Sequence, residues 1–153
     1  MTAPVKHYTA SAIILSDGQP RKALLLHHRK HGKWLPPGGH QEAYENSLEA
    51  VIRETREETG LDIAPYLPAP QPFDANVTIQ PLPAFIQEQR VPAHGIEPEH
   101  YHLDMNYVVR IPEQTVRHAA VEAHDIRWFT LDEINTLDTF EDLRAVLIQE
   151  LSK

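Results

Sequence analysis

One helical segment constrains this chain more than any other feature, because it gathers many acidic side chains between glycines. The segment runs from Asn46 to Thr59 with helical period, and Gly60 follows it as the expected stop. Glutamate occupies positions 42, 45, 49, 54, 57 and 58 within or just before this segment. Acidic clusters on helices usually face water, so the first question is whether this one is only a solvated surface.

A helical projection divides these glutamates into groups. Steps of about 100° per residue place Glu54, Glu57 and Glu58 within one arc of roughly 100°. That arc adjoins the face that we expect to pack on a sheet, whereas Glu49 points away from both. The expected packing face consists of Leu48, Ile52, Thr55 and Thr59. The three carboxylates repel one another at the negative end of the helix dipole, and bound divalent cations would offset that repulsion. On this segment alone, a solvated helix with arginine ion-pair partners remains the alternative.

Composition narrows the remaining function classes. A chain of 153 residues with 41% apolar residues favours a single domain over residues 1–153. A net charge of -8 argues against an extended nucleic-acid surface, although divalent cations could supply positive charge locally. The absence of cysteine excludes thiolate nucleophiles and disulfides. The N-terminal residues contain no apolar run of membrane-spanning length, so we expect a cytoplasmic protein without membrane contact.

The rest of the sequence predicts strands through the first two thirds of the chain and helices at its end. Strands are expected at His7–Leu15, Lys22–Arg29, Phe73–Ile79 and His100–Ile111, with extended segments also starting at Leu61 and Asp125. A helix capped near Thr130 or Asp132 and an amphipathic helix over Phe140–Leu151 are expected to follow. This order suits an α+β fold in which helices cover a central mixed sheet.

Residues 39–61 resemble the signature of the Nudix hydrolase family. Its fixed positions are matched by Gly39, Glu45, Arg53, Glu54, Glu57, Glu58, Gly60 and Leu61. Thr55 stands where the family has an aliphatic residue, a departure that weakens burial more than chemistry. A chance match of seven charged or glycine positions has a probability of about 10⁻⁸ to 10⁻⁹ per starting position. The resemblance implies a Nudix-like α/β/α sandwich with a central mixed sheet.

The resemblance also implies a role for each matched residue. The expected ligands of Mg²⁺ or Mn²⁺ are Glu54, Glu57, Glu58 and the carbonyl of Gly38, with one glutamate serving as general base. Glu45 and Arg53 are expected to orient these carboxylates. The family's reaction is cleavage of a diphosphate linkage, usually in a nucleoside diphosphate derivative, by a metal-activated water. The expected partner is therefore a small nucleotide-like diphosphate, and a homodimer is an expectation from the family alone.

Two other activities are compatible with this fold. A nucleotide-binding or sensor module without catalysis would usually have lost carboxylates that this chain retains. A prenyl diphosphate isomerase would use an essential cysteine, which this chain lacks. In the family, residues some fifteen to eighteen positions past the signature mark subgroups, and here that region is Ala75–Ile79. It contains neither the proline nor the tyrosine associated with the ADP-ribose and dinucleoside polyphosphate subgroups. Nucleoside triphosphates, nucleotide sugars, ADP-ribose and dinucleoside polyphosphates all remain open as substrates.

Three polar residues of a predicted strand form a second candidate group. His100, His102 and Asp104 alternate, so their side chains project from one face of that strand. A polar sheet surface is one interpretation. Metal ligation and contact with a substrate phosphate or base are the others, because Mn²⁺ tolerates imidazole.

Further candidates are charged side chains outside the signature. Arg29 and Lys33 lie shortly before the glycines and are expected phosphate contacts, with ordinary surface charge as the alternative. Glu122 precedes the predicted strand near Trp128, a position similar to that of a late glutamate that assists metal binding or proton transfer in several family members.

Overall fold

Two long strands that are distant in the sequence pair in parallel at the centre of a mixed sheet. The computed structural model describes residues 3–117 and 123–153, and the strands β1 (Lys6–Ser16) and β8 (His100–Ile111) pair along the whole length of β1. Antiparallel neighbours flank this pair, in the order β3-β2-β1-β8-β7, with β4 paired to β1 and β9 paired to β2. These neighbours are β2 (Lys22–His28), β3 (Trp34–Leu35), β4 (Gly38–His40), β7 (Phe85–Val91) and β9 (Ala123–Thr130).

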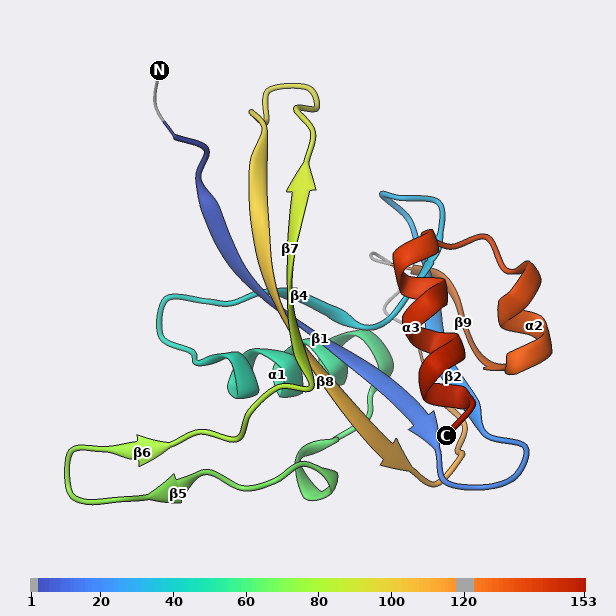
Figure 1. Cartoon of the computed structure of the whole chain (residues 1–153), viewed down its shortest axis with the longest axis horizontal. Helices are drawn as coiled ribbons and strands as arrows, with labels where there is room; N and C mark the ends of the chain where they lie inside the picture. Colours follow the sequence, from blue (N-terminus) through green and yellow to red (C-terminus); the bar gives the residue numbers. More distant parts are fainter. Residues whose placement is uncertain (1–2, 118–122) are drawn as a thin grey trace.

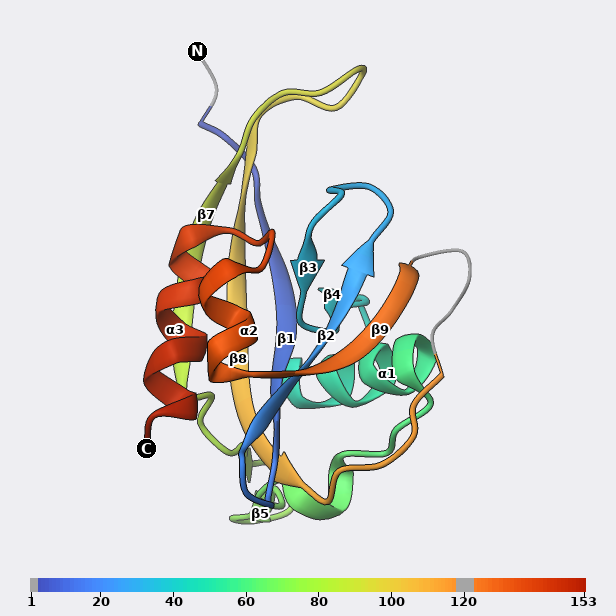
Figure 2. The ribbon, with the colours of Figure 1, turned by 90° about the vertical axis from the view of Figure 1, so that its right-hand side faces the viewer.

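Helices cover the two faces of this sheet, as the perpendicular views show (Figures 1 and 2). On one face lies α1 (Ser47–Thr59), and on the other lie α2 (Leu131–Thr136) and α3 (Glu141–Leu151). The apolar alternation of β1 supplies both cores: Ala10, Ala12 and Ile14 join the α1 side, whereas Ile13 and Leu15 join the α3 side. The expected α+β architecture with a mixed sheet is therefore confirmed.

The ends of α1 are fixed by local sequence. Asn46 is the N-cap, and its side chain forms a capping box with Glu49. Gly60 closes the helix at a φ of 75°, a left-handed conformation that glycine adopts without a Cβ clash. The packing face differs in part from the helical projection, since Ala50 and Val51 are fully buried while Ile52 is only partly so.

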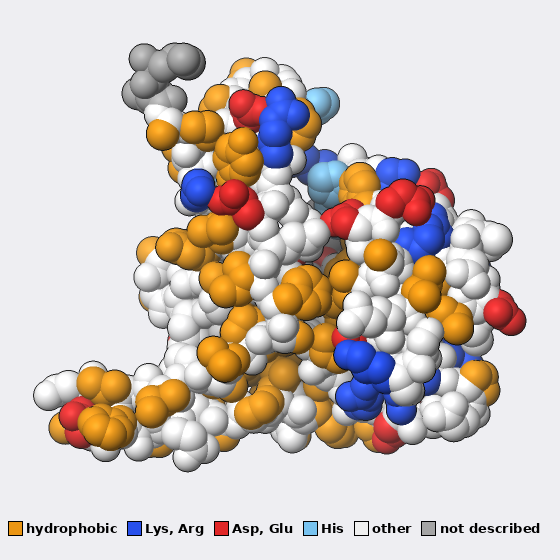
Figure 3. All heavy atoms as spheres, viewed as in Figure 1, with side chains coloured by type: hydrophobic (Ala, Val, Ile, Leu, Met, Phe, Trp, Pro, Cys, Tyr) orange, Lys and Arg blue, Asp and Glu red, His pale blue; other side chains and the backbone are white. Residues whose placement is uncertain are grey.

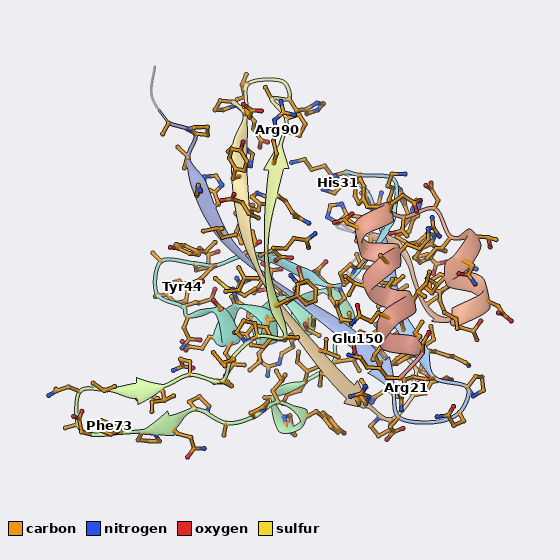
Figure 4. All side chains as sticks on the ribbon, in the orientation of Figure 1. Arg21, His31, Tyr44, Phe73, Arg90 and Glu150 are labelled. Carbon is orange, nitrogen blue, oxygen red and sulfur yellow. The ribbon has the colours of Figure 1, made fainter. Side chains whose placement is uncertain are left out.

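The proline-rich middle of the chain was predicted less well. The strand expected at Phe73–Ile79 is wrong: those residues form the turn and one side of a small hairpin between β5 (Gln71–Pro72) and β6 (Thr78–Ile79). The Asp74 carboxylate accepts the amides of Asn76 and Val77 and so holds the turn. This hairpin extends away from the body, with Phe73 near its tip (Figure 4). The extended segment expected from Leu61 is also wrong, because a 3₁₀ turn over Ala64–Tyr66 follows directly.

The C-terminal elements agree with the sequence predictions. Thr130 is the N-cap of α2, as expected, and α3 covers the predicted amphipathic segment. Arg144 of α3 donates to the carbonyls of Ile134 and Leu137 and thereby ties the two helices together. Within the described residues, no helix is both long and apolar enough to cross a membrane.

Candidate active site

Two consecutive glycines let β4 lie close to β1 on one side and to α1 on the other. A Cβ on Gly38 would lie 2.5 Å from the carbonyl oxygen of Ala10 in β1. A Cβ on Gly39 would lie 2.5 Å from Oε1 of Glu54 and 2.6 Å from its carboxyl carbon. Real Cβ atoms do not tolerate such distances. The glycines are therefore required at these positions by contact with β1 and with Glu54, rather than by their backbone angles.

The pairing of β4 with β1 also determines where the backbone groups of Gly38 point. Ala12 donates to the Pro37 carbonyl, and the Gln41 amide donates to the Tyr8 carbonyl. In an antiparallel ladder the hydrogen-bonded residues alternate, so Gly38 directs its own N–H and C=O away from β1. Its N–H donates to Oε1 of Glu58 at 2.8 Å. The Gly38 carbonyl is thus directed away from the ladder.

Arg53 is the centre of a charged network on α1. Its Nε and Nη2 donate to the two carboxylate oxygens of Glu45 at 2.6 and 2.9 Å, a bidentate contact. Its Nη1 donates to Glu54 at 3.0 Å and to Glu57 at 3.2 Å, and Nη2 also reaches the His40 carbonyl. The hydrogen bonds from Arg53 hold the pKa of Glu45 below its ordinary value, and those same bonds raise the pKa of Arg53. Arg53 therefore links Glu45 to two of the three glutamates on α1.

Burial separates the three glutamates that the projection placed on one arc. Glu58 is 2% exposed, whereas the side chain of Glu54 is 14% exposed and that of Glu57 is 53% exposed. Glu58 turns toward the Gly38 amide, and Glu57 reaches Arg53 from the outer side. The carboxylates thus form a graded series from the sheet to the surface. All three offer oxygen donors, which suit hard divalent cations such as Mg²⁺ and Mn²⁺.

A cleft of about 1090 Å³ lies on the face of β1 and β8 that points away from α1. Gly38 and Gly39 of β4 form part of its wall. The hollow is visible between the tip of the β7–β8 arm and the rest of the molecule, with histidine on both sides (Figure 3). Arg90 on β7 and His31 in the turn after β2 lie on opposite sides of it (Figure 4). Lys30, in the turn after β2, and Glu97, in the connection between β7 and β8, form an ion pair of 3.6 Å at the edge of the cleft.

Asp104 lies on the floor of this cleft and is largely satisfied by its neighbours. It is 7% exposed and accepts hydrogen bonds from Thr9, Ser11 and Asn106 at 2.8 to 3.1 Å. Burial raises its pKa, and these hydrogen bonds oppose the rise. The alternation predicted for His100, His102 and Asp104 places all three on the cleft side. Asp104 organises the floor between β1 and β8, while the histidines lie farther toward the open end.

Four imidazoles gather at that end. His7, His40 and His102 each offer a ring nitrogen, and these atoms lie within 4.8 Å of one another. Within residues 3–117 and 123–153, this is the one group of three or more His, Cys, Asp or Glu side chains that converges so closely. His100 lies beside it, with its Nε2 3.2 Å from Nε2 of His102. We refer to His7, His40, His100 and His102 as the histidine cluster.

The remaining predicted contacts fall outside both groups. Arg29 is exposed in the turn after β2, and Lys33 pairs with Asp138 at 2.8 Å; neither lines the cleft. Lys30, between them, does line it. Glu122 lies outside the described residues.

Sequence reasoning gave no role to His7 or His40. The signal that unites them with His102 is strand register: His7 pairs with His102, and His40 pairs with Thr9. That register joins segments far apart along the chain, so sequence spacing does not reveal it.

Comparison with known proteins agrees with this architecture. The family described as the NUDIX domain matches residues 5–151. The chain is 30% identical over 135 residues to the bis(5'-nucleosyl)-tetraphosphatase [asymmetrical] of Rattus norvegicus, a match that covers 80% of this chain and 69% of the relative. A NUDIX family hydrolase from Clostridium perfringens superposes with a TM-score of 0.72 at 25% identity, covering 95% of this chain and 96% of that one. The fold is also that of a C. elegans Ap4A hydrolase, with a TM-score of 0.62, 17% identity and 95% coverage of both chains. The chain therefore belongs to the Nudix family, as a hydrolase acting on phosphoanhydride bonds.

Proposed function

We propose that this chain hydrolyses a nucleoside polyphosphate at a carboxylate site formed by Glu54, Glu57, Glu58 and the Gly38 carbonyl, with Mg²⁺ or Mn²⁺ as cofactor. The observation that carries the proposal is the Arg53 network. One guanidinium holds Glu45, Glu54 and Glu57 together, while the Gly38 amide holds Glu58. A merely solvated helix would not need two glycines, a buried glutamate and a bidentate arginine on the same side.

The donor set fits a hard divalent cation. Carboxylate and carbonyl oxygens are the ligands that Mg²⁺ prefers, and Mn²⁺ accepts the same set. The Glu54 carboxylate occupies the space that a Cβ on Gly39 would fill, so the glycine leaves room for it beside β4. When bound, such an ion would neutralise phosphate charge and lower the pKa of a water molecule. This local charge matters because the whole chain carries a net charge of -8.

The protein's own groups perform three tasks in this proposal. Arg53 bridges Glu45 to Glu54 and Glu57, which limits the rotation of these side chains. Glu58, 2% exposed, keeps its orientation through the backbone of β4. A carboxylate oxygen of this group accepts the proton that the attacking water releases.

Dinucleoside tetraphosphates are the substrate class that we propose to test first. The support is the similarity to the rat tetraphosphatase over 80% of this chain. The adjoining cleft, of about 1090 Å³, is roomy for a nucleotide-sized ligand, since typical ligand pockets measure roughly 300–1,000 Å³. A nucleoside triphosphate is the second candidate, favoured if the cleft accommodates only one nucleoside.

The proposal is tested with a panel of a dinucleoside tetraphosphate, a nucleoside triphosphate, ADP-ribose and a nucleotide sugar, each with Mg²⁺, with Mn²⁺ or with chelator. We expect turnover that depends on metal and falls at least about 10²-fold in Glu54→Gln. The matched control is Glu49→Gln on the same helix, because glutamine can also complete the capping box. Absence of metal-dependent turnover on every substrate would instead favour a binding module without catalysis.

A further inference from the structure

We propose that the histidine cluster is a second metal site, separate from the carboxylate site, which binds a Zn²⁺-class transition ion through His7, His40 and His102. Their ring nitrogens lie within 4.8 Å of one another. Two nitrogens that share a tetrahedral Zn²⁺ at 2.0–2.1 Å lie roughly 3.3 Å apart. Small side-chain rotations therefore suffice to bring the three nitrogens to one ion.

Strand register determines the position of each ligand. The three histidines come from three paired strands: His40 from β4, His7 from β1 and His102 from β8. His7 is in parallel register with His102, and His40 pairs with Thr9, two residues along β1 on the same face. The ring centroids lie 5.5 Å apart for His7 and His40 and 4.9 Å apart for His40 and His102. Ligands on a paired sheet are positioned more rigidly than ligands on loops.

His100 has the hydrogen bonding of a fourth ligand. Its Nδ1 lies 3.0 Å from the Pro98 carbonyl, and because a carbonyl only accepts, that nitrogen carries the proton. In the neutral ring the lone pair is then on Nε2, which faces Nε2 of His102 at 3.2 Å. Histidines that bind metals usually donate their other ring N–H to a carbonyl or carboxylate in this way.

One ring nitrogen of the cluster is left without a partner by the fold. Among the described residues, His7 Nδ1 is one of three buried side-chain atoms that have no hydrogen-bond partner. A metal ion bound by this nitrogen would satisfy it.

The donor chemistry distinguishes this site from the carboxylate site. Imidazole suits Zn²⁺, Cu²⁺ and Ni²⁺, whereas oxygen sets suit Mg²⁺, Ca²⁺ and Mn²⁺. The histidine cluster lines the cleft, so an ion held by three of its rings would present its remaining position either to His100 or to a ligand in the cleft.

The test is titration of the full chain with Zn²⁺ by calorimetry, in millimolar Mg²⁺ to saturate oxygen sites. We expect one Zn²⁺ per chain, with affinity reduced at least about 10²-fold in His102→Gln and in His7→Gln. His124→Gln, which alters an exposed histidine of β9, and Glu54→Gln should retain the wild-type affinity. Circular dichroism of each metal-free variant verifies its fold.

The Co²⁺ absorption spectrum of the wild-type chain provides a readout that does not depend on any variant folding. Intense visible bands of four-coordinate Co²⁺ with nitrogen ligands are expected. Weak bands of six-coordinate Co²⁺ would overturn the proposal, and so would Zn²⁺ affinity that survives His102→Gln and His7→Gln or disappears in Glu54→Gln.

Discussion

The carboxylate site and the histidine cluster both adjoin strand β4, but different kinds of contact position their side chains. The carboxylates belong to one helix and are positioned by charge: Arg53 and the Gly38 amide hold them individually. The imidazoles belong to three strands and are positioned by backbone pairing. The first site therefore depends on side-chain contacts that a single substitution can redirect, whereas the second depends on strand register, which a surface substitution leaves intact.

The largest effect that separates the two sites is expected from Gly39→Ala. The new Cβ would lie 2.5 Å from Oε1 of Glu54, the end of a flexible side chain, so the carboxylate should move and the fold should persist. We expect hydrolysis to fall by about 100-fold while Zn²⁺ binding stays within a few-fold of wild type. Steady-state kinetics and calorimetry measure the two effects. Gly18→Ala is the control, because no atom lies within 4 Å of a Cβ there; equal losses in both glycine variants would refute the contact argument.

Arg53→Lys should have the next largest effect. A lysine ammonium cannot make the bidentate contact with Glu45 and still reach Glu54 and Glu57. We expect activity to fall about tenfold, with a raised metal concentration for half-maximal rate, because the carboxylates lose their orientation. Arg56→Lys on the same helix, an exposed residue paired with Asp62, should behave as wild type. Full activity in Arg53→Lys would mean that the network does not position the ligands.

Glu45→Gln tests the same network through stability rather than activity. Since Arg53 holds the pKa of Glu45 below 4.5, this carboxylate stabilises the fold above pH 4.5, and the stabilisation is lost as the pH falls through the lowered value. We expect the variant to unfold with about 1–2 kcal/mol less free energy at pH 7. The difference from wild type should shrink on acidification below pH 4.5. Urea unfolding of the metal-free proteins across this range measures it, and a difference independent of pH would contradict the assignment.

The sequence predicts a site within one helix better than a site assembled by strand pairing. The candidate carboxylate site lies within one helix and its flanking turns, so helical spacing grouped Glu54, Glu57 and Glu58 and predicted the Gly60 stop. The resemblance to the Nudix signature added Arg53 and Glu45. Spacing could not predict that Glu58 is buried while Glu57 is exposed, because the difference arises where β4 passes the helix.

Only two members of the histidine cluster could be predicted, because His100 and His102 alternate in one strand while His7 and His40 join them through pairing between distant segments.

Strand β7 was not predicted from the sequence. Its residues Gln87 and Gln89 face the cleft, so the segment shows neither an apolar run nor a buried face.

The smallest expected effect is on stability, from changes to two threonines that face the sheet from α1. Only the carboxylate site depends on this helix. Thr55 is fully buried, and its hydroxyl has no hydrogen-bond partner among the described residues. The Thr59 hydroxyl, in contrast, donates to the Thr55 carbonyl at 2.6 Å and accepts from the Leu61 amide. Thr55→Val removes an unsatisfied group and should raise the free energy of unfolding by about 1 kcal/mol. Thr59→Val removes a satisfied one from the same helix and should lower it by a similar amount, because the Leu61 amide loses its acceptor. Urea denaturation measures both, and Zn²⁺ affinity should be unchanged in either variant since strands carry the histidines. Changes of the same sign in the two variants would show that valine acts through packing volume rather than through the hydroxyl.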